Sequence, residues 1–198
     1  MIGSIGKDQS DHEKGHRLSD WAGYNSSVDN GVQISLFETA WGTCGILARG
    51  QRIVRFSLPG PMRTVKRILT ERIQGEIVHN PSIHKQLQKL VVVYFQGRPV
   101  DFSGVEVDLS GMTEFQQAVL TACRKIGYGK TASYSDLAER VGRPSAIRAA
   151  ASAIASNPIP LIIPCHRILC KNRNLGGFSA FGGIATKSRL LRLEQAPI

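Results

Sequence analysis

Residues 157–170 read NPIPLIIPCHRILC, and no other stretch of the chain constrains the local backbone so strongly. Its three prolines exclude a helix over 158–164, because proline lacks an amide hydrogen and its ring clashes with the preceding turn. The apolar residues between the prolines predict a buried, extended segment. This segment ends at Cys165, His166 and Arg167.

The residues beside Cys165 favour a reactive thiol over an inert one. A lone free cysteine is usually buried and unreactive. Here His166 offers a proton acceptor and Arg167 favours the thiolate. Adjacent residues of an extended chain point to opposite sides, so a bridging water or a local turn would have to connect His166 to Cys165.

A metal site is the competing interpretation of Cys165, His166 and Cys170. The sequence contains no C-x-x-C pair and no second histidine at ligand spacing, and Cys44 and Cys123 lie in quite different surroundings. We therefore predict no metal site.

The residues before this segment predict a helix-turn-helix. Apolar positions over 115–126 indicate a helix that Thr113 caps and the glycines at 127 and 129 end. A short helix from Ser135 to Val141 and an Ala-rich helix from Pro144 follow, with a glycine-containing turn between them.

Arg148 lies among five alanines in the predicted Ala-rich helix. A surface of methyl groups would allow close approach to a DNA duplex while the long cation reaches in. A tightly packed alanine helix with a solvated arginine is the alternative interpretation.

Towards the N-terminus, residues 31–109 predict a small α/β unit. Strands are expected at 32–39, 43–49, 52–58 and 105–109, and helices at 62–73 and 83–95. Residues 1–30 are polar and predict a disordered tail. We expect three parts: the tail, an α/β domain over 31–109, and a DNA-binding and catalytic domain over 110–198.

The composition is that of a packed globular protein. The 198-residue chain is 42% hydrophobic and 20% charged, which excludes collagen, coiled coil and wholesale disorder. The longest apolar run, 90–95, is far shorter than the roughly 20 residues of a membrane-spanning helix. The N-terminus lacks the apolar core of a signal peptide, and the four cysteines suggest reduced thiols. We expect a cytoplasmic protein.

The positive charge is confined to one part of the sequence. Lys plus Arg number 25 and Asp plus Glu 15, which gives +10. Residues 115–192 contain 12 basic residues and two acids, so this segment alone carries +10, and the other 13 basic and 13 acidic residues balance. Such asymmetry favours a nucleic-acid partner over a merely basic surface.

Residues 157–168 resemble the active-site signature of the O6-alkylguanine-DNA alkyltransferases, also called methylated-DNA–protein-cysteine methyltransferases. Other matching positions are Phe115-Gln116, 126–131, Ser133-Tyr134, Leu137-Ala138, Arg148-Ala149, Gly182-Gly183, Lys187, Leu190-Leu191 and Glu194. The match covers 115–194 strongly and 32–109 loosely. It implies an α/β plus mainly α fold, with a small ribonuclease H-like unit followed by a helical domain that carries a winged-helix-like helix-turn-helix.

By position, the resemblance implies that Cys165 is the nucleophile and alkyl acceptor. His166 takes the thiol proton through a water, and Glu194 orients His166. Asn157 braces the active-site turn, while Tyr134 assists rotation of the nucleotide and hydrogen-bonds the flipped base.

The resemblance also implies binding residues. Arg148 fills the vacated place in the base stack, and the main-chain carbonyls of Cys165 and Ile168 read the guanine amino group. The other implied DNA-binding residues are Tyr134, Ser145, Ala149 and Arg167. The implied substrate-pocket residues are Ile168, Phe178, Ser179 and Phe181. The chain departs from the family over 177–181, where the aromatic-Ser or Tyr-Ala pair that often precedes the paired glycines is missing, and at Ala151, where many members have Gly.

The implied reaction is an irreversible, single-turnover transfer from O6-alkylguanine, and from O4-alkylthymine, in double-stranded DNA to Cys165. It needs no cofactor, and the protein acts as a monomer. A non-enzymatic lesion-binding protein is the first alternative, but such relatives replace the nucleophile, and Cys165 is present. A Cys-His-Glu hydrolase is the second, and it would leave the basic Ala-rich helix unexplained.

Overall fold

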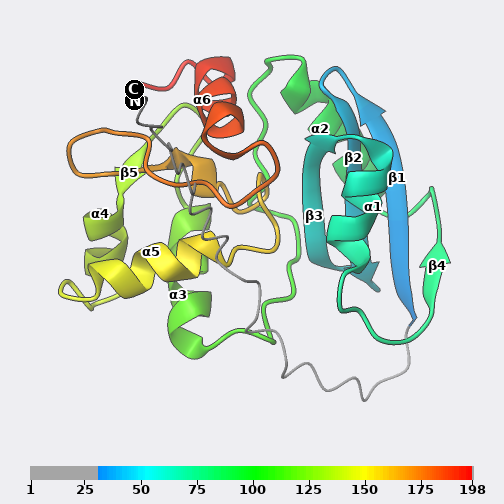
Figure 1. The fold of residues 1–198 in the computed structure, drawn as a ribbon, viewed down its shortest axis with the longest axis horizontal. Helices are drawn as coiled ribbons and strands as arrows, with labels where there is room; N and C mark the ends of the chain where they lie inside the picture. The colour runs from blue at the N-terminus through cyan, green and yellow to red at the C-terminus, as the bar shows by residue number, and fades with distance from the viewer. Residues whose placement is uncertain (1–30, 198) are drawn as a thin grey trace, which may run out of the picture.

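A four-stranded sheet forms the first part of the fold in the computed structural model, which describes residues 31–197 (Figure 1). The strands lie in the order β3-β2-β1-β4. The first three form an antiparallel meander, and β4 pairs parallel to β1. Their bounds are β1 Val32–Thr39, β2 Gly42–Arg49, β3 Arg52–Gly60 and β4 Ile77–His79.

The three strands of the meander are confirmed. Residues 43–48 of β2 are all buried, because helices cover both faces of the sheet. The strand β4 was not predicted, since three residues are too few to show a period. The strand expected at 105–109 is wrong. Only Val107 bridges to Ile53 of β3. Further along β3, the amide of Phe56 donates to Pro158 O at 3.0 Å.

Two helices cover opposite faces of the sheet. Helix α1 (Met62–Thr70) buries Val65 and Leu69 against one face. Helix α2 (Lys85–Phe95) lies on the other, where it joins the main core of the molecule. Both helices were predicted, but α1 ends before 73 and α2 begins after 83.

The second part is mainly helical (Figure 1). The predicted helix after Thr113 is confirmed, and Thr113 forms a reciprocal capping box with Gln116. The second helix begins at Tyr134 and not at Ser135, because Ser133 caps it through the same box with Asp136. The elements are α3 Glu114–Arg124, β5 Ala132–Ser133, α4 Tyr134–Arg140, α5 Ile147–Ala155, η1 Cys165–Arg167, β6 Ile168–Leu169 and α6 Gly183–Leu193.

The Ala-rich helix begins later than expected. Helix α5 starts at Ile147 and not at Pro144, because a turn in which the Ala146 amide donates to Arg143 O at 2.9 Å precedes it. The strands β5 and β6 pair in parallel, so the chain just after the reactive segment is tied to the start of α4.

The segment over 158–164 is buried, as predicted, but it is not extended. The amide of Ile163 donates to Ile159 O at 2.9 Å, and Leu161 adopts a left-handed φ of 76°. The chain therefore folds back on itself before it reaches Cys165. Prolines exclude a helix but permit such a turn, which needs few backbone donors.

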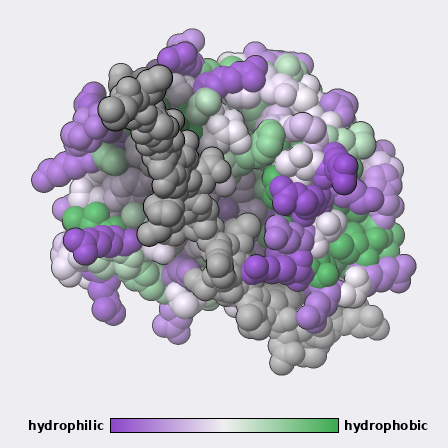
Figure 2. All heavy atoms as spheres, in the orientation of Figure 1, coloured by the Kyte–Doolittle hydropathy of each residue, from purple (hydrophilic) through white to green (hydrophobic). Residues whose placement is uncertain are grey.

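The two parts share one continuous core, and side chains pair across their boundary. The guanidinium of Arg189 in α6 lies 3.6 Å from the ring centre of Trp41, next to the β1–β2 turn. Figure 2 shows hydrophilic side chains around the edge of this face and hydrophobic areas among the described residues. No helix within 31–197 is long and apolar enough to cross a membrane. The predicted tail over 1–30 lies outside the described residues.

Candidate active site

The single turn η1 places Cys165, His166 and Arg167 in a fully buried position. The amide of Cys165 donates to Ile163 O at 2.7 Å, and that of Arg167 donates to Pro164 O at 2.9 Å. The three side chains therefore leave a tight turn and not an extended chain. The expectation that they alternate along an extended segment is wrong in this respect.

Asn157 holds the folded-back segment in shape. Its Nδ2 donates to Ile163 O at 2.9 Å, and its Oδ1 accepts from the Ile159 amide at 3.0 Å. One side chain thus satisfies a donor and an acceptor of a buried loop that has few partners in regular structure.

Burial dominates the electrostatics of Cys165. The side chain is 4% exposed, and loss of water raises the pKa of the thiol above its usual value. A hydrogen bond from Asn157 and the nearby charge of Lys187 act in the opposite direction. The thiol is therefore protonated at neutral pH, and a nucleophilic role requires a base.

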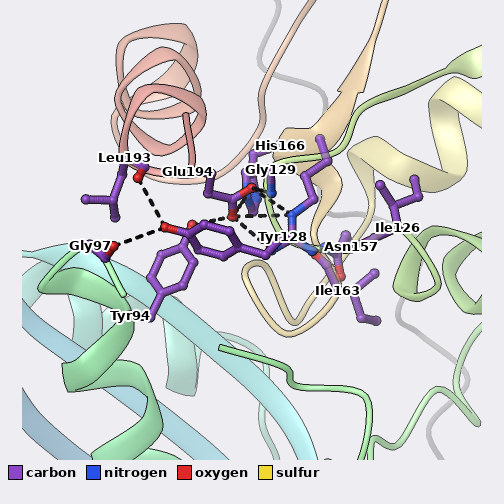
Figure 3. Close-up of polar contacts among 11 residues, drawn as sticks. Tyr94, Gly97, Ile126, Tyr128, Gly129, Asn157, Ile163, His166, Leu193 and Glu194 are labelled. Carbon is purple, nitrogen blue, oxygen red and sulfur yellow. Dashed lines mark hydrogen bonds and ion pairs between the residues drawn. The ribbon is translucent and has the colours of Figure 1, made fainter. Parts of the chain in front are cut away.

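Glu194 lies directly after α6 and is the centre of a buried polar cluster (Figure 3). Its Oε1 accepts from His166 Nε2 at 2.9 Å and from Arg167 Nη2 at 2.8 Å. Its Oε2 accepts from Arg167 Nε at 2.9 Å and from the Gly129 amide at 3.2 Å. Burial alone would raise the pKa of Glu194, but these donors and charges lower it to about 2.

The charge of Glu194 fixes the tautomer of His166. An ionised carboxylate only accepts, so the Nε2 of His166 carries the hydrogen. Burial lowers the pKa of His166, which keeps the ring neutral at physiological pH. Its Nδ1 is then an unprotonated acceptor, and the described residues give this buried atom no hydrogen-bond partner.

Arg167 points inward, although it was expected among the DNA-binding residues. It is 5% exposed, and besides its bonds to Glu194 its Nη1 donates to Ile126 O at 2.6 Å. Its guanidinium also lies 6.0 Å from the ring centre of Tyr128. This placement makes Arg167 a partner of the carboxylate.

Lys187 is a buried cation that the sequence matched to the family without assigning it a role. Its Nζ donates to Ile168 O at 2.5 Å and to Leu175 O. Burial lowers the pKa of the amine, and the neighbouring cysteines counteract that change. The only signal in the sequence is one lysine among the apolar residues of the last helix.

Tyr134 starts α4 and is partly buried beside the cysteines. Burial, followed by the proximity of Cys170 and Cys165, raises the pKa of its hydroxyl, which remains a donor. A side chain on Gly176 would come within 3.6 Å of this hydroxyl. Tyr134 therefore lies between the reactive turn and the loop that follows it.

The predicted DNA-binding residues of α5 lie on the surface. Arg148 and Ala149 are exposed in its first turn, and Ser145 is exposed just before it. The opposite side of α5 packs Ala150 and Ala153 into the core. Helix α5 thus has a buried face of alanines and an exposed face with one cation.

The four predicted pocket residues differ in burial and in the residues that they contact. Ile168 is fully buried in the core, and Phe178 packs partly against it. The hydroxyl of Ser179 donates to Ala155 O at 2.6 Å, at the end of α5. Phe181 is 39% exposed, and its ring packs on Gly60 of β3, which leaves no room there for a side chain.

One residue of the site comes from the first part of the molecule and was missed. The hydroxyl of Tyr94 in α2 donates to Glu194 Oε1 at 2.7 Å. A tyrosine on the apolar face of a predicted helix is ordinary core. The only available signal is that a buried phenol needs a polar partner. Within residues 31–197, no three His, Cys, Asp or Glu side chains gather where a metal ion could bind.

Sequence comparisons identify relatives of the chain. Residues 114–196 match the family described as 6-O-methylguanine DNA methyltransferase, DNA binding domain. The methylated-DNA–protein-cysteine methyltransferase of Haemophilus influenzae is 45% identical over 126 residues, 60% of this chain and 69% of the relative. That of Mycobacterium bovis is 45% identical over 140 residues, 69% of this chain and 82% of the relative.

A solved structure agrees with these sequences. The crystal structure of Mycobacterium tuberculosis OGT in complex with DNA superposes with a TM-score of 0.70 at 31% identity, over 84% of this chain and 96% of the other. The chain belongs to the methylated-DNA–protein-cysteine methyltransferase family.

Proposed function

We propose that this protein repairs double-stranded DNA by transferring the alkyl group of O6-alkylguanine to Cys165, once per molecule. The carrying observation is a buried thiol in the same tight turn as His166, which Glu194 holds with Nδ1 as its acceptor. Attack on a saturated alkyl carbon needs a soft nucleophile, which a thiolate supplies.

In the proposed relay, His166 Nδ1 receives the thiol proton through a water molecule. Glu194 holds the opposite nitrogen, so the imidazolium that forms stays next to a carboxylate. Asn157 keeps the turn in place and hydrogen-bonds the sulfur as it becomes negative. Burial raises the pKa of the Cys165 thiol, so the thiol stays protonated until His166 takes its proton.

The reaction balances without a cofactor. The carbon–oxygen bond of the O6-alkyl group breaks as a carbon–sulfur bond to Cys165 forms. The thiol gives up one proton, and the guanine that leaves takes up one at N1. The product is a thioether, and no other substrate is consumed. O4-alkylthymine presents the same type of bond, and we include it as a second substrate.

We propose that DNA binds across the exposed face of α5. Arg148 would fill the gap left by the damaged base, with Ser145 and Ala149 against the backbone. A base must leave the stack to reach a buried sulfur. Tyr134, which is partly buried near Cys165 and Cys170, would meet that base. The carbonyl of Ile168, tied by Lys187, would accept from the guanine amino group. Phe178, Ser179 and Phe181 would border the pocket.

We also propose the finer architecture. Residues 31–109 would form a ribonuclease H-like unit, and 110–198 a catalytic unit in which α4 and α5 are a winged-helix-like helix-turn-helix. The mixed sheet with helices on both faces supports the first assignment. The short turn between α4 and α5 supports the second. We propose that the protein is a cytoplasmic monomer, and its four free cysteines support a reducing compartment.

The test is the stoichiometry of repair. Full-length protein is mixed with excess duplex that contains O6-methylguanine, and both repaired DNA and intact protein mass are measured. Repair should stop at one mole per mole of protein, with one methyl-for-hydrogen replacement in the peptide that contains Cys165. Turnover beyond one equivalent would overturn the proposal.

The matched control compares Cys165 with Cys170, which follows β6. Cys165→Ser should show neither repair nor mass change, yet still bind duplex DNA. Cys170→Ser should keep both the repair and the mass change, because Cys170 lies outside the reactive turn. A methyl group on Cys170 in the wild-type protein would contradict the assignment.

A further inference from the structure

Tyr94 connects the first part of the molecule to the reactive cluster. It lies in the last turn of α2, its side chain is fully buried, and its hydroxyl donates to Glu194 Oε1 at 2.7 Å. Figure 3 shows the ring rising from α2 toward the carboxylate at the end of α6. The site of the second part is therefore completed by a side chain from the first.

We propose that Tyr94 is a positioning residue for alkyl transfer: its hydroxyl fixes the Glu194 carboxylate, which in turn holds His166 with Nδ1 as the proton acceptor. The inference rests on the alkyl transfer proposed above. Tyr94 acts through Glu194 and does not touch the reacting atoms.

The geometry around the carboxylate carries the inference. Three groups donate to Oε1, from Tyr94 at 2.7 Å, Arg167 at 2.8 Å and His166 at 2.9 Å. Arg167 and Gly129 occupy Oε2. A carboxylate offers about four lone-pair directions, so all of them are used. Rotation of the group would break several bonds at once. Of these donors from residues 31–197, Tyr94 alone belongs to the sheet part.

Tyr94 remains a donor throughout the physiological range. Burial and the charge of Glu194 raise the pKa of its phenol well above 10. Its ring is held edge-on by Phe95, with centres 5.2 Å apart, and by Tyr128, with centres 5.9 Å apart. The hydroxyl is therefore directed at the carboxylate by packing on both sides.

Removing the hydroxyl should change the basicity of His166. Tyr94→Phe leaves Glu194 with one donor fewer, so its negative charge is less neutralised and favours the imidazolium more strongly. The pKa of His166 then rises, and neutral imidazole is available only at higher pH. The other charged and titratable groups that face His166 and Glu194 are Arg167, Lys187, Cys165 and Tyr128.

The experiment measures the pH dependence of alkylation by free O6-benzylguanine, which reports the chemistry without DNA. Tyr94→Phe should move the acid limb upward by about half to one pH unit. The rate above the limb should fall about 3- to 10-fold, the worth of one hydrogen bond. Tyr128→Phe is the matched control, because its hydroxyl donates to Leu193 O at 3.1 Å and not to the carboxylate. Its limb should stay in place.

A second measurement does not depend on activity. Nitrogen NMR of the full-length Cys165→Ser protein reports the tautomer and pKa of His166, with and without Tyr94→Phe. A raised His166 pKa or a mixed tautomer supports the inference. An unmoved limb together with an unchanged tautomer would overturn it, leaving Tyr94 as packing only. If wild-type protein were never alkylated, the proposed function would fail, while the NMR result would still judge Tyr94.

Discussion

The two parts of the molecule bury different kinds of polar residue. Over 31–109, the buried polar side chains are the small hydroxyls Ser35, Thr43 and Ser57. Over 110–197, the buried polar side chains are Asn157, His166, Arg167, Lys187 and Glu194. The first part is thus an apolar sandwich of sheet and helices, whereas the second buries charge.

Stability alone does not explain this difference. A buried ion pair loses its hydration, and a well-packed apolar substitute is often as stable or more stable. A cluster of charges around Glu194 is therefore better explained by the chemistry at Cys165 than by folding. The apolar part serves as a support, and its one polar contribution to the cluster is Tyr94.

The largest effect should come from removing the proposed base, His166, from the buried charged cluster of the second part. His166→Ala leaves a thiol whose pKa burial keeps high, so the nucleophile stays protonated. Alkyl transfer should slow by about 10²–10⁴-fold, the usual contribution of a general base. Binding to undamaged duplex should stay nearly unchanged, because His166 is buried away from the exposed face of α5. Wild-type transfer rates in this variant would exclude the relay.

The buried charge should also appear in the response to acid. The pKa of Glu194 is lowered from its ordinary 4.5 to about 2, so its stabilisation is complete above pH 4.5 and is lost as pH falls toward 2. At 1.36 kcal/mol per pKa unit the loss is about 3 kcal/mol. His166, whose pKa burial lowers, adds to the acid loss below pH 6.5.

Urea unfolding at a series of pH values tests this in wild type and Glu194→Gln. The variant should be less stable at neutral pH and flatter between pH 4.5 and 2. Glu106→Gln, an exposed acid of the first part, controls for the loss of one negative charge. Equal slopes in wild type and Glu194→Gln would contradict the buried network.

The same difference between the parts explains what the sequence could predict. The meander and its two helices follow apolar periods, so they were found nearly to the residue. In the second part, Thr113 and the glycine ends marked α3 correctly. The sequence offered a local turn at Cys165 and His166 only as an alternative to a bridging water, because prolines indicate only that a helix is excluded. The shape of this turn depends on Asn157 bonds within the loop, which no period encodes.

The candidate site was predictable only where residues lie close in sequence or match the family. Cys165 and His166 are adjacent, and Glu194 came from the resemblance alone. Tyr94 lies a hundred positions from Glu194, and a core tyrosine has no distinguishing pattern. The resemblance implied a DNA-binding role for Arg167, whereas its partner in the structure is the buried carboxylate of Glu194.

Arg148→Ala should reduce the repair rate less than His166→Ala does, because Arg148 acts in holding the DNA and not in the transfer step. Arg148→Ala should slow repair of O6-methylguanine in duplex by about 10- to 100-fold, since holding a base out of the stack costs a few kcal/mol. Reaction with free O6-benzylguanine should change little, because Arg148 is exposed on α5, away from the buried cluster. Equal losses on both substrates would refute the stack-filling role.

The smallest effect on activity should come from a substitution on the far face of the first part, the sheet face that α1 covers. A Cβ on Gly45 of β2 would lie 2.4 Å from Leu69 and 2.8 Å from Val65 of α1, on the face opposite Tyr94. Gly45→Ala should therefore lower the free energy of unfolding by about 1–3 kcal/mol through overpacking. Gly104→Ala, where nothing lies within 4 Å of the added carbon, is the control.

For folded Gly45→Ala protein, the alkyl-transfer rate and its acid limb should match the wild type. The α1 face supports the sheet, whereas only the α2 face reaches the Glu194 cluster, through Tyr94. Chemical unfolding and transfer to free O6-benzylguanine, measured on the same samples, separate the two effects. If Gly45→Ala moved the acid limb as far as Tyr94→Phe, the far face would be coupled to the site. The contrast between an inert support and a charged site would then fail.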